Sequence, residues 1–140
     1  MTAETAAKRD AFRRLHAAGC FVIPNPWDVG SARYLQHLGF QALASTSAGA
    51  AFTMGLPDTD RAVSCDVMLA HVASIVAATE LPVNADFGAG YADAPEALAE
   101  NVRRCVATGV AGLSIEDATG DTREPLFEPG LAAARVRAAR

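Results

Sequence analysis

The feature that most constrains the fold is a repeated alternation of short apolar runs with amphipathic stretches. The apolar runs, centred on residues 21–23, 43–45, 83–85 and 113–115, are typical of strands, and a helical pattern follows each of them. Strands that alternate with helices form βαβ units, whose strands run parallel and are joined by right-handed crossovers. We therefore expect an α/β fold with four parallel strands that neighbour one another in chain order.

The helices are delimited by capping and stop signals. We expect helices over 4–18, closed by Gly19, over 31–38, closed by Gly39, and over 129–140. A further helix should begin after Ser64, which is a good N-cap. Another should begin at Asp93, which has capping-box spacing to Glu96. The stretch FTMGLPDTDRA, residues 52–62, contains Gly, Pro and Asp and is expected to be a loop.

Composition narrows the class of protein. The chain has 140 residues, of which 51% are hydrophobic and 20% charged, which suits one folded domain. The net charge of −4, without a basic cluster, argues against nucleic-acid binding. No apolar run is long enough for a membrane span, and the N-terminus lacks the apolar core of a signal peptide. We expect a cytoplasmic protein that binds neither nucleic acid nor membrane.

The cysteines and histidines suggest no site. Cys20, Cys65 and Cys105 form neither a CxxC pair nor a zinc pattern, and we interpret them as small buried thiols in a reducing compartment. The three histidines, which lie in predicted helices, are interpreted as structural or surface residues: His16, His37 and His71.

Polar residues gather where each predicted strand ends. In parallel α/β folds that edge of the sheet binds ligands. The residues, in chain order, are Asn25, Asp28, Ser45, Thr46, Ser47, Asn84, Asp86, Glu116 and Asp117.

Several of these residues also have a purely structural interpretation. Asn25 and Asp28 could build the turn around Pro26, residues 45–47 could cap a short helix, and Asp117 could be a turn residue.

Asp86 and Glu116 are less easily explained in that way. Two carboxylates at equivalent strand ends repel one another unless a cation joins them. Oxygen ligands of this kind suit Mg²⁺, which keeps several waters. The pattern favours a metal or acid/base site, with solvated carboxylates at a loop edge as the alternative.

Four segments together resemble a known family. FVIPNPWDVGSAR, ALASTSAGAAFTMGLPD, LPVNADFGAGY and GVAGLSIEDATGD resemble, in order and spacing, the isocitrate lyase / phosphoenolpyruvate mutase superfamily. The branch near 2-methylisocitrate lyase and the phosphonopyruvate-processing enzymes is the most similar. The resemblance implies a (β/α)₈ barrel that uses Mg²⁺ (or Mn²⁺). Its substrate would be a small 2-oxo or 2-hydroxy acid, processed through an enolate with C–C or C–P bond cleavage.

The resemblance also implies roles for individual residues. Asp86 corresponds to the direct metal ligand, which also contacts the substrate, and Glu116 to the residue that holds metal-bound water. Asp58, in GLPD, corresponds to an Asp beside the substrate and is our candidate catalytic residue. The strand end that cradles the substrate's oxygens corresponds to Ser45, Thr46 and Ser47.

The sequence departs from the family pattern at three places. Asn84 stands where a first metal-shell Asp is expected, so it joins the metal set without a charge, and Gly88 stands where the related branch often has Glu. Residues 118–127, ATGDTREPLF, replace a Lys-Cys-Gly-His loop. The Cys that the lyases use as acid/base is therefore missing, which argues against isocitrate or methylisocitrate cleavage. Lyase, decarboxylase and C–P hydrolase activities remain open.

Chain length bears on the fold as well. A complete (β/α)₈ barrel takes about 250 residues, whereas this sequence has 140. We expect residues 1–140 to form a partial domain, the N-terminal half of a barrel with about four βα units preceded by a helix. The family's carboxylate-gripping Arg would then lie beyond Arg140. A half-barrel leaves strand edges unpaired, so we expect self-association into a homo-oligomer and weak turnover. The alternative function is an inactive half-barrel or interaction module that needs a partner half.

Overall fold

The computed structural model describes residues 2–59 and 62–140. Six helices and three strands lie within those residues. The expected stop signals Gly19 and Gly39 each follow a helix, although the first helix ends at Leu15, earlier than the expected residue 18. In chain order the elements are α1 (Ala3–Leu15), α2 (Val29–His37), β1 (Leu43–Ala44), α3 (Ser47–Thr53), α4 (Cys65–Ala78), β2 (Val83–Asp86), α5 (Pro95–Ala107), β3 (Gly112–Ser114) and α6 (Pro129–Ala139). None of the described helices is long and apolar enough to cross a membrane.

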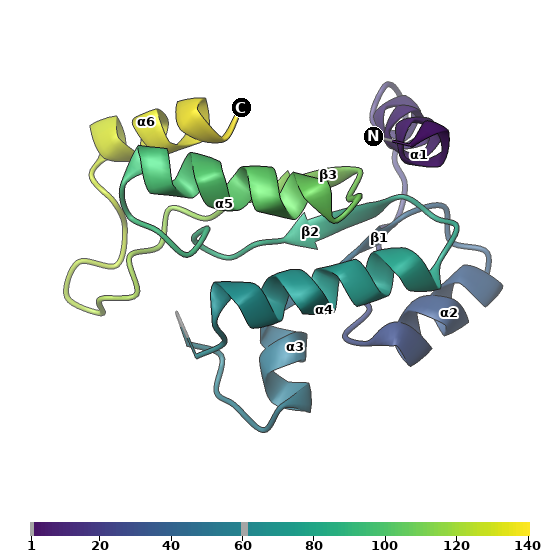
Figure 1. Ribbon diagram of the computed structural model, residues 1–140, viewed down its shortest axis with the longest axis horizontal. Coiled ribbons are helices and arrows are strands. Elements are labelled where there is room, and N and C mark those ends of the chain that lie inside the picture. The colour runs from purple at the N-terminus through teal and green to yellow at the C-terminus, as the bar shows by residue number, and fades with distance from the viewer. Residues whose placement is uncertain (1, 60–61) are drawn as a thin grey trace.

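The three strands form one parallel sheet in the order β1-β2-β3 (Figure 1). Leu43 pairs with Val83, and Asn84 pairs with Gly112, so the strands start nearly level. This confirms the parallel α/β class and the sequential order of the last three predicted strands.

The first predicted strand, residues 21–23, is wrong: the structure has no strand there. The segment still runs beside β1, because the Ala44 N–H donates to Pro24 O at 3.0 Å and Asn25 Nδ2 donates to Ala44 O at 2.9 Å. Pro24 and Pro26 lack the N–H donors that a strand ladder needs, so the pairing does not continue.

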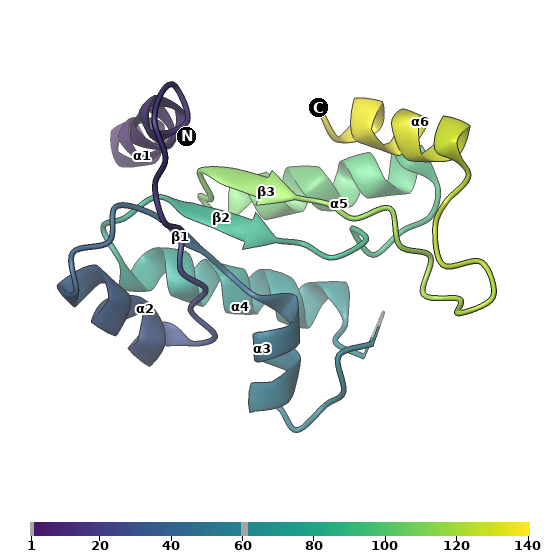
Figure 2. The same cartoon turned by 180° about the vertical axis from the view of Figure 1, so that it is seen from behind.

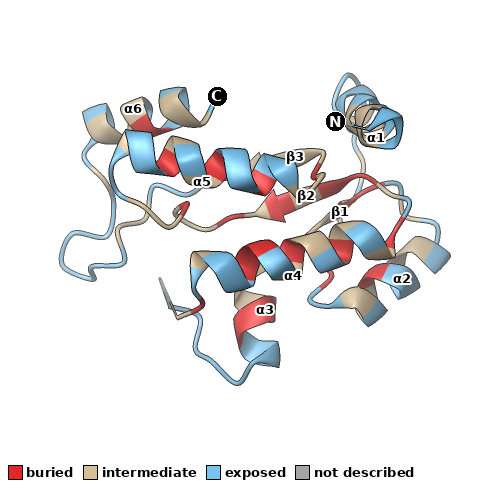
Figure 3. Ribbon diagram, in the orientation of Figure 1, coloured by how far each residue is buried: buried red, intermediate tan, exposed pale blue. Residues whose placement is uncertain are grey.

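The core lies between the sheet and helices α4 and α5, which cover the same face of it (Figures 1 and 3). Ala85 and Phe87 pack there against buried residues of α4 and α5, including Met68, Val72 and Cys105. Along β2, Val83 and Ala85 are buried while Asn84 and Asp86 are half-buried. Because side chains alternate along a strand, Asn84 and Asp86 point to the face opposite the core.

Helix α1 lies at the N-terminal ends of the strands (Figure 2) and is fastened by two cations. Lys8 Nζ donates to Thr79 O, at the end of α4, at 2.9 Å. Arg9 donates to Val106 O, in the last turn of α5, and to Val110 O, both at 3.0 Å. Cations at helix C-termini satisfy free carbonyls and complement the helix dipole. At the opposite end of the sheet, where the strands finish, the chain continues into the segments that precede α3, α5 and α6.

Two further local expectations need correction, and one is confirmed. Ser64 does cap α4, accepting from the Val67 N–H. The cap of α5 is Ala94, without a side-chain bond, and not Asp93. Pro95 takes the first helical position, which is where proline fits best, and this starts the helix one residue later. The expectation that all three cysteines are buried is wrong for Cys20, which is exposed, whereas Cys65 is half-buried and Cys105 buried.

Gly90 has a strict steric requirement for glycine. Its φ is +75°, and an added Cβ would lie 2.1 Å from Leu98 Cδ1, which belongs to a fully buried side chain of α5. Gly39 has a similar φ of +88° but open space around it.

We expect Gly39→Ala to cost about 1–2 kcal/mol of stability through backbone strain alone. Gly90→Ala should cost roughly 1–3 kcal/mol more through overpacking. Denaturant unfolding of both variants measures this, and equal losses would contradict it.

His71, on α4, links stability to pH. Its Nε2 is buried without a hydrogen-bond partner among the described residues. Burial lowers the pKa of His71 from its ordinary 6.5, and the nearby Asp28 carboxylate raises it by less. The unfolded chain therefore takes up a proton first as the pH falls. We expect this contribution to be fully present above about pH 7 and to be lost progressively as the pH falls below 6.5.

Unfolding at pH 7.5 and 5.5 tests this. The free energy of unfolding should fall less between the two values for His71→Gln than for the parent chain. His37→Gln, at an exposed position of α2, is the control and should keep the parental difference. An unchanged difference in His71→Gln would exclude His71 as the source.

Candidate active site

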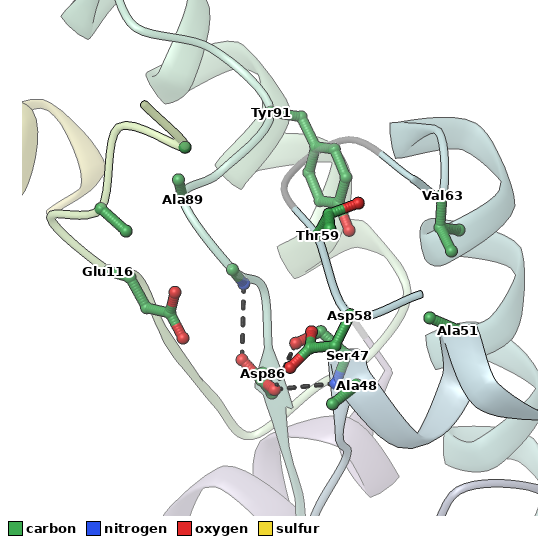
Figure 4. Close-up of a pocket in the computed structure, with 13 residues that line it drawn as sticks. Ser47, Ala48, Ala51, Asp58, Thr59, Val63, Asp86, Ala89, Tyr91 and Glu116 are labelled. Atoms are coloured by element: carbon green, nitrogen blue, oxygen red, sulfur yellow. Dashed lines mark hydrogen bonds between the residues drawn. The ribbon is translucent and has the colours of Figure 1, made fainter. Parts of the chain in front are cut away.

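A cavity of about 410 Å³ opens at the ends of the strands (Figure 4). Its polar side is formed by four residues from separate segments of the chain: Ser47, Asp58, Asp86 and Glu116. The rest of its lining consists of small and apolar residues and of the hydroxyl-bearing Thr59 and Tyr91, and comprises Ala48, Ala51, Thr59, Val63, Gly88, Ala89, Tyr91, Ala118 and Gly120. The position matches the ligand-binding edge of parallel α/β folds.

Asp86, the last residue of β2, is held firmly in place. Its Oδ2 accepts two hydrogen bonds from Ser47, one from the backbone N–H and one from Oγ, both at 2.8 Å. Its Oδ1 accepts a longer bond from the Gly88 N–H at 3.4 Å. Bonds to an ionised acceptor are stronger than those between neutral groups. One carboxylate oxygen is therefore fixed by the start of α3, and the other stays available on the cavity side.

The three hydroxyl residues that were expected to hold the substrate's oxygens, Ser45, Thr46 and Ser47, do not share one role. Ser45 is 1% exposed, and its Oγ accepts from the Asp86 N–H at 3.0 Å. Thr46 Oγ1 accepts from the Gly49 N–H at 3.0 Å and is the N-cap of α3. The interpretation of this stretch as a helix cap is thus confirmed for Thr46. Among the three hydroxyl residues, only Ser47 lines the cavity.

Asp58 and Glu116 approach Asp86 from two different segments. Asp58 lies on the loop between α3 and α4, next to Ser47, while Glu116 follows β3 and faces Asp86 from the opposite side (Figure 4). The Glu116 N–H donates to Gly88 O at 2.9 Å, which ties the two strand ends together. The structure therefore brings the three predicted carboxylates into one cavity.

Asn84 is placed deeper than the other predicted ligands. It shares a face with Asp86 but lies two residues earlier on β2, and it does not line the cavity. Its Oδ1 lies over Gly112 of β3, where an added Cβ would come within 2.9 Å of it.

The remaining strand-end residues have structural partners. Asp28 caps α2 in a reciprocal capping box with Ser31, and the hydrogen bonds from Ser31 lower the pKa of its carboxyl. Asn25 bonds the β1 backbone. The Asp117 carbonyl accepts from the Phe127 N–H at 2.8 Å, within the loop that follows β3. Asp28 is thus a structural helix cap and Asn25 a partner of the β1 backbone, whereas the contact of Asp117 involves only its backbone and leaves its turn interpretation a prediction.

Charge in the cavity has one sign. Three carboxylates line it, and no Lys, Arg or His side chain does so in the ranges 2–59 and 62–140. Carboxylates gathered in this way repel anions and attract cations. The same ranges contain no group of three His, Cys, Asp or Glu side chains that could enclose a metal ion. The donor set therefore fits a hydrated Mg²⁺, which takes one or two carboxylates and keeps its other waters, and does not fit a closed metal site.

The apolar wall of the cavity was not predicted from the sequence. Tyr91 has a φ of +61°, and its ring packs edge-on against Phe87 with ring centroids 5.1 Å apart. Ala51 and Val63 complete this wall from α3 and the loop before α4. Tyr91 follows Gly88 and Gly90 in the sequence, and this glycine-rich context was the available signal of an unusual backbone.

Comparison with known proteins assigns the chain to one family. The family profile described as "Phosphoenolpyruvate phosphomutase" matches residues 12–140. A lyase/mutase candidate from Burkholderia cenocepacia J2315 is 47% identical, with a TM-score of 0.94 over 99% of this chain and 49% of that one.

Two further solved structures share the fold. The 2,3-dimethylmalate lyase, a member of the PEP mutase/isocitrate lyase superfamily, is 30% identical with a TM-score of 0.82, over 99% of this chain and 48% of that one. A phosphonopyruvate hydrolase in complex with oxalate and Mg²⁺ is 20% identical with a TM-score of 0.85, over 99% of this chain and 47% of that one. Because the phosphonopyruvate hydrolase is only 20% identical, its similarity to this chain concerns the fold alone.

The chain spans about half the length of the relatives that it matches. A curated, uncharacterised protein from Mycobacterium tuberculosis is 38% identical over 128 residues, which are 90% of this chain and 46% of that protein. The parallel sheet, the carboxylates at its strand ends and the profile match over residues 12–140 agree with one another. This chain belongs to the phosphoenolpyruvate phosphomutase family, within the PEP mutase/isocitrate lyase superfamily.

Proposed function

We propose that this chain carries the acidic, cation-binding part of the active site of a Mg²⁺-dependent enzyme. The enzyme would act on a small 2-oxo or 2-hydroxy acid, pass through an enolate and cleave a C–C or C–P bond. The observation that carries the proposal is the convergence of Asp58, Asp86 and Glu116 on one cavity at the strand ends. Family membership supports it, since the relatives include a lyase and a phosphonopyruvate hydrolase.

Electrostatics makes a cation part of the proposal. A carboxylate substrate is an anion, and the cavity that would receive it is lined by three acidic side chains. Such a substrate binds there only when a cation neutralises part of that charge. Mg²⁺ or Mn²⁺, when bound, supplies Lewis-acid stabilisation of negative charge on substrate oxygens. The related phosphonopyruvate hydrolase was crystallised with oxalate and Mg²⁺, which supports this choice.

Each residue of the cavity has a proposed role. Asp86 holds the cation directly, because Ser47 fixes one of its oxygens and leaves the other turned to the cavity. Glu116 accepts hydrogen bonds from the waters that the cation retains. Asp58 exchanges a proton with the substrate as acid or base. Ser47 orients the substrate, while Ser45, Thr46 and Asn84 support the site from outside the cavity. Asn84 makes cation affinity lower than an Asp at the same position would, because its side chain carries no charge.

The reaction subtype depends on the segment after β3. Residues 118–127 form a rim closed by an antiparallel bridge between Ala118 and Leu126, and Ala118 and Gly120 reach the cavity. This segment has no cysteine, so the proposed enzyme does not rely on a thiol acid/base there. Lyase, decarboxylase and C–P hydrolase activities are the subtypes that an activity screen must separate.

A second candidate function is an inactive half-barrel or interaction module that needs a partner half. The observation that favours it is the lack of any basic side chain in the described lining of the cavity. Groups that grip the substrate's carboxylate would then come from another stretch of polypeptide. We further propose a homo-oligomer in the cytoplasm. The free thiols of Cys20, Cys65 and Cys105 suit a reducing compartment.

An activity screen separates the two candidates. We expect Mg²⁺-dependent turnover of small 2-oxo or 2-hydroxy acids by a version of this chain extended to the length of its relatives. The 140-residue chain alone should turn over far more slowly, because the described lining of its cavity contains no basic group to hold the substrate's carboxylate. Measured oxo-acid consumption and phosphate release distinguish C–C from C–P cleavage. An extended chain that is inactive on all these acids would favour the interaction module.

Asp86→Asn tests the cation site directly. Removing the charge while keeping the shape should weaken Mg²⁺ or Mn²⁺ binding by about 10–100-fold, since affinity depends on ligand charge. Ser47→Ala should cause a smaller loss, because it removes one of the two bonds that hold Asp86 Oδ2. Asp117→Asn, outside the cavity, is the matched control and should bind like the parent. Equal titration isotherms for Asp86→Asn and the parent would remove Asp86 from the ligand set.

A further inference from the structure

Arg135, on α6, is the one charged residue that is buried in the described part of the chain, with 1% of its surface exposed. Its Nη1 donates to the carbonyls of Ala92 and Asp93, the latter at 2.8 Å, and its Nη2 donates to the carbonyl of Ala89. The guanidinium also lies over the Phe127 ring, 4.1 Å from its centroid. Burying a charge is costly unless its hydrogen bonds are made. The three carbonyls and the aromatic ring supply the partners of this guanidinium.

All three carbonyls belong to one short loop, residues 87–93, which joins β2 to α5 and which we call the glycine loop. Gly88, Gly90 and Tyr91 all have positive φ, at +50°, +75° and +61°. Tyr91 is the sole non-glycine residue with positive φ in the described chain. A backbone of this kind persists only when its surroundings hold it in place.

The carbonyls of the glycine loop are bound from both sides. Inside the fold, Phe87 O accepts from the Gly90 N–H and Gly88 O from the Glu116 N–H, both at 2.9 Å. On the α5 side, Asn101 Nδ2 donates to Gly90 O at 3.0 Å. Arg135 alone binds three more carbonyls of this loop, and it reaches them from a helix more than 40 residues away in sequence.

The same loop is a wall of the acidic cavity. Gly88, Ala89 and Tyr91 line it, and Gly88 touches both acidic residues that face each other there. Its N–H donates to Asp86 Oδ1, and its carbonyl accepts from the Glu116 N–H. A shift of the glycine loop therefore changes how Asp86 and Glu116 face one another (Figure 4).

We propose that Arg135 is a positioning residue of this site. It fixes the glycine loop through the carbonyls of Ala89, Ala92 and Asp93. That in turn sets the Asp86–Glu116 separation to suit one hydrated divalent cation. Arg135 does not line the acidic cavity; it borders a neighbouring cavity of about 370 Å³ together with Glu116 and Asp117. The cation part of this inference rests on the proposed function, whereas the hold on the loop does not.

The test compares Arg135→Met and Arg135→Lys with Arg137→Met, an exposed position on the same helix. Amide hydrogen exchange is followed in the glycine loop and, as reference, in α4. Mn²⁺ binding is followed by the electron paramagnetic resonance signal of the free ion. Arg135→Met should speed exchange in the loop by about tenfold or more while α4 keeps its protection. It should also weaken Mn²⁺ binding by about tenfold, the lower end for loss of an outer-shell partner.

Arg135→Lys keeps the charge but not the planar fork that reaches three carbonyls. The Arg135→Lys chain should remain folded even if the Arg135→Met chain does not. Its hydrogen exchange in the glycine loop and its Mn²⁺ affinity should lie between those of the parent and of Arg135→Met. Arg137→Met should match the parent chain in both measurements. Unchanged loop exchange in both Arg135 variants, or exchange that rises equally in the loop and in α4, would overturn the inference. If the parent chain binds no Mn²⁺, the proposed function fails, and loop exchange alone then decides whether Arg135 positions the loop.

Discussion

The pair of hydrogen bonds from Ser47 to Asp86 is the interaction on which the site depends. A carboxylate at the end of an apolar strand is unfavourable unless donors replace the water that it loses. The first residue of α3 supplies those donors, from its backbone and from its hydroxyl. Ser45, two residues earlier in the chain, accepts a hydrogen bond from the Asp86 N–H. The end of β1, the start of α3 and the end of β2 are thereby fixed relative to one another.

Local sequence signals were enough to predict most of the fold. Apolar runs at 43–45, 83–85 and 113–115 became parallel strands, because each is followed by an amphipathic helix that returns the chain to the same edge. The run at 21–23 is more apolar than these three, yet the prolines that follow it leave too few donors for a ladder. The start of α5 moved by one residue for a related reason, since Pro95 prefers the first helical position.

The acidic part of the site was predictable for a topological reason. Parallel strands finish at a common edge, so residues that follow different strands meet there without any knowledge of side-chain packing. The hydroxyls were less predictable. Ser45 accepts from the Asp86 N–H of the neighbouring strand and Thr46 from the Gly49 N–H of its own helix. Which of the three adjacent hydroxyls reaches the cavity is decided by where α3 begins. Tyr91 and Arg135 were beyond prediction, because their positions come from loop conformation and from packing between α5 and α6.

The position of the buried Arg135 outside the acidic cavity leaves the negative charge of that cavity unneutralised. The cavity itself is lined by carboxylates and no described cation, so its charge favours a mobile divalent ion over a fixed protein cation. Arg135 directs its guanidinium at backbone carbonyls of the glycine loop, outside the acidic cavity. A fixed guanidinium among the three carboxylates would neutralise the charge that attracts a metal. Placed behind the loop, the same group stabilises the strained backbone of Tyr91 and leaves that charge available. The helix α6 thus contributes to the geometry of the site without lining its cavity.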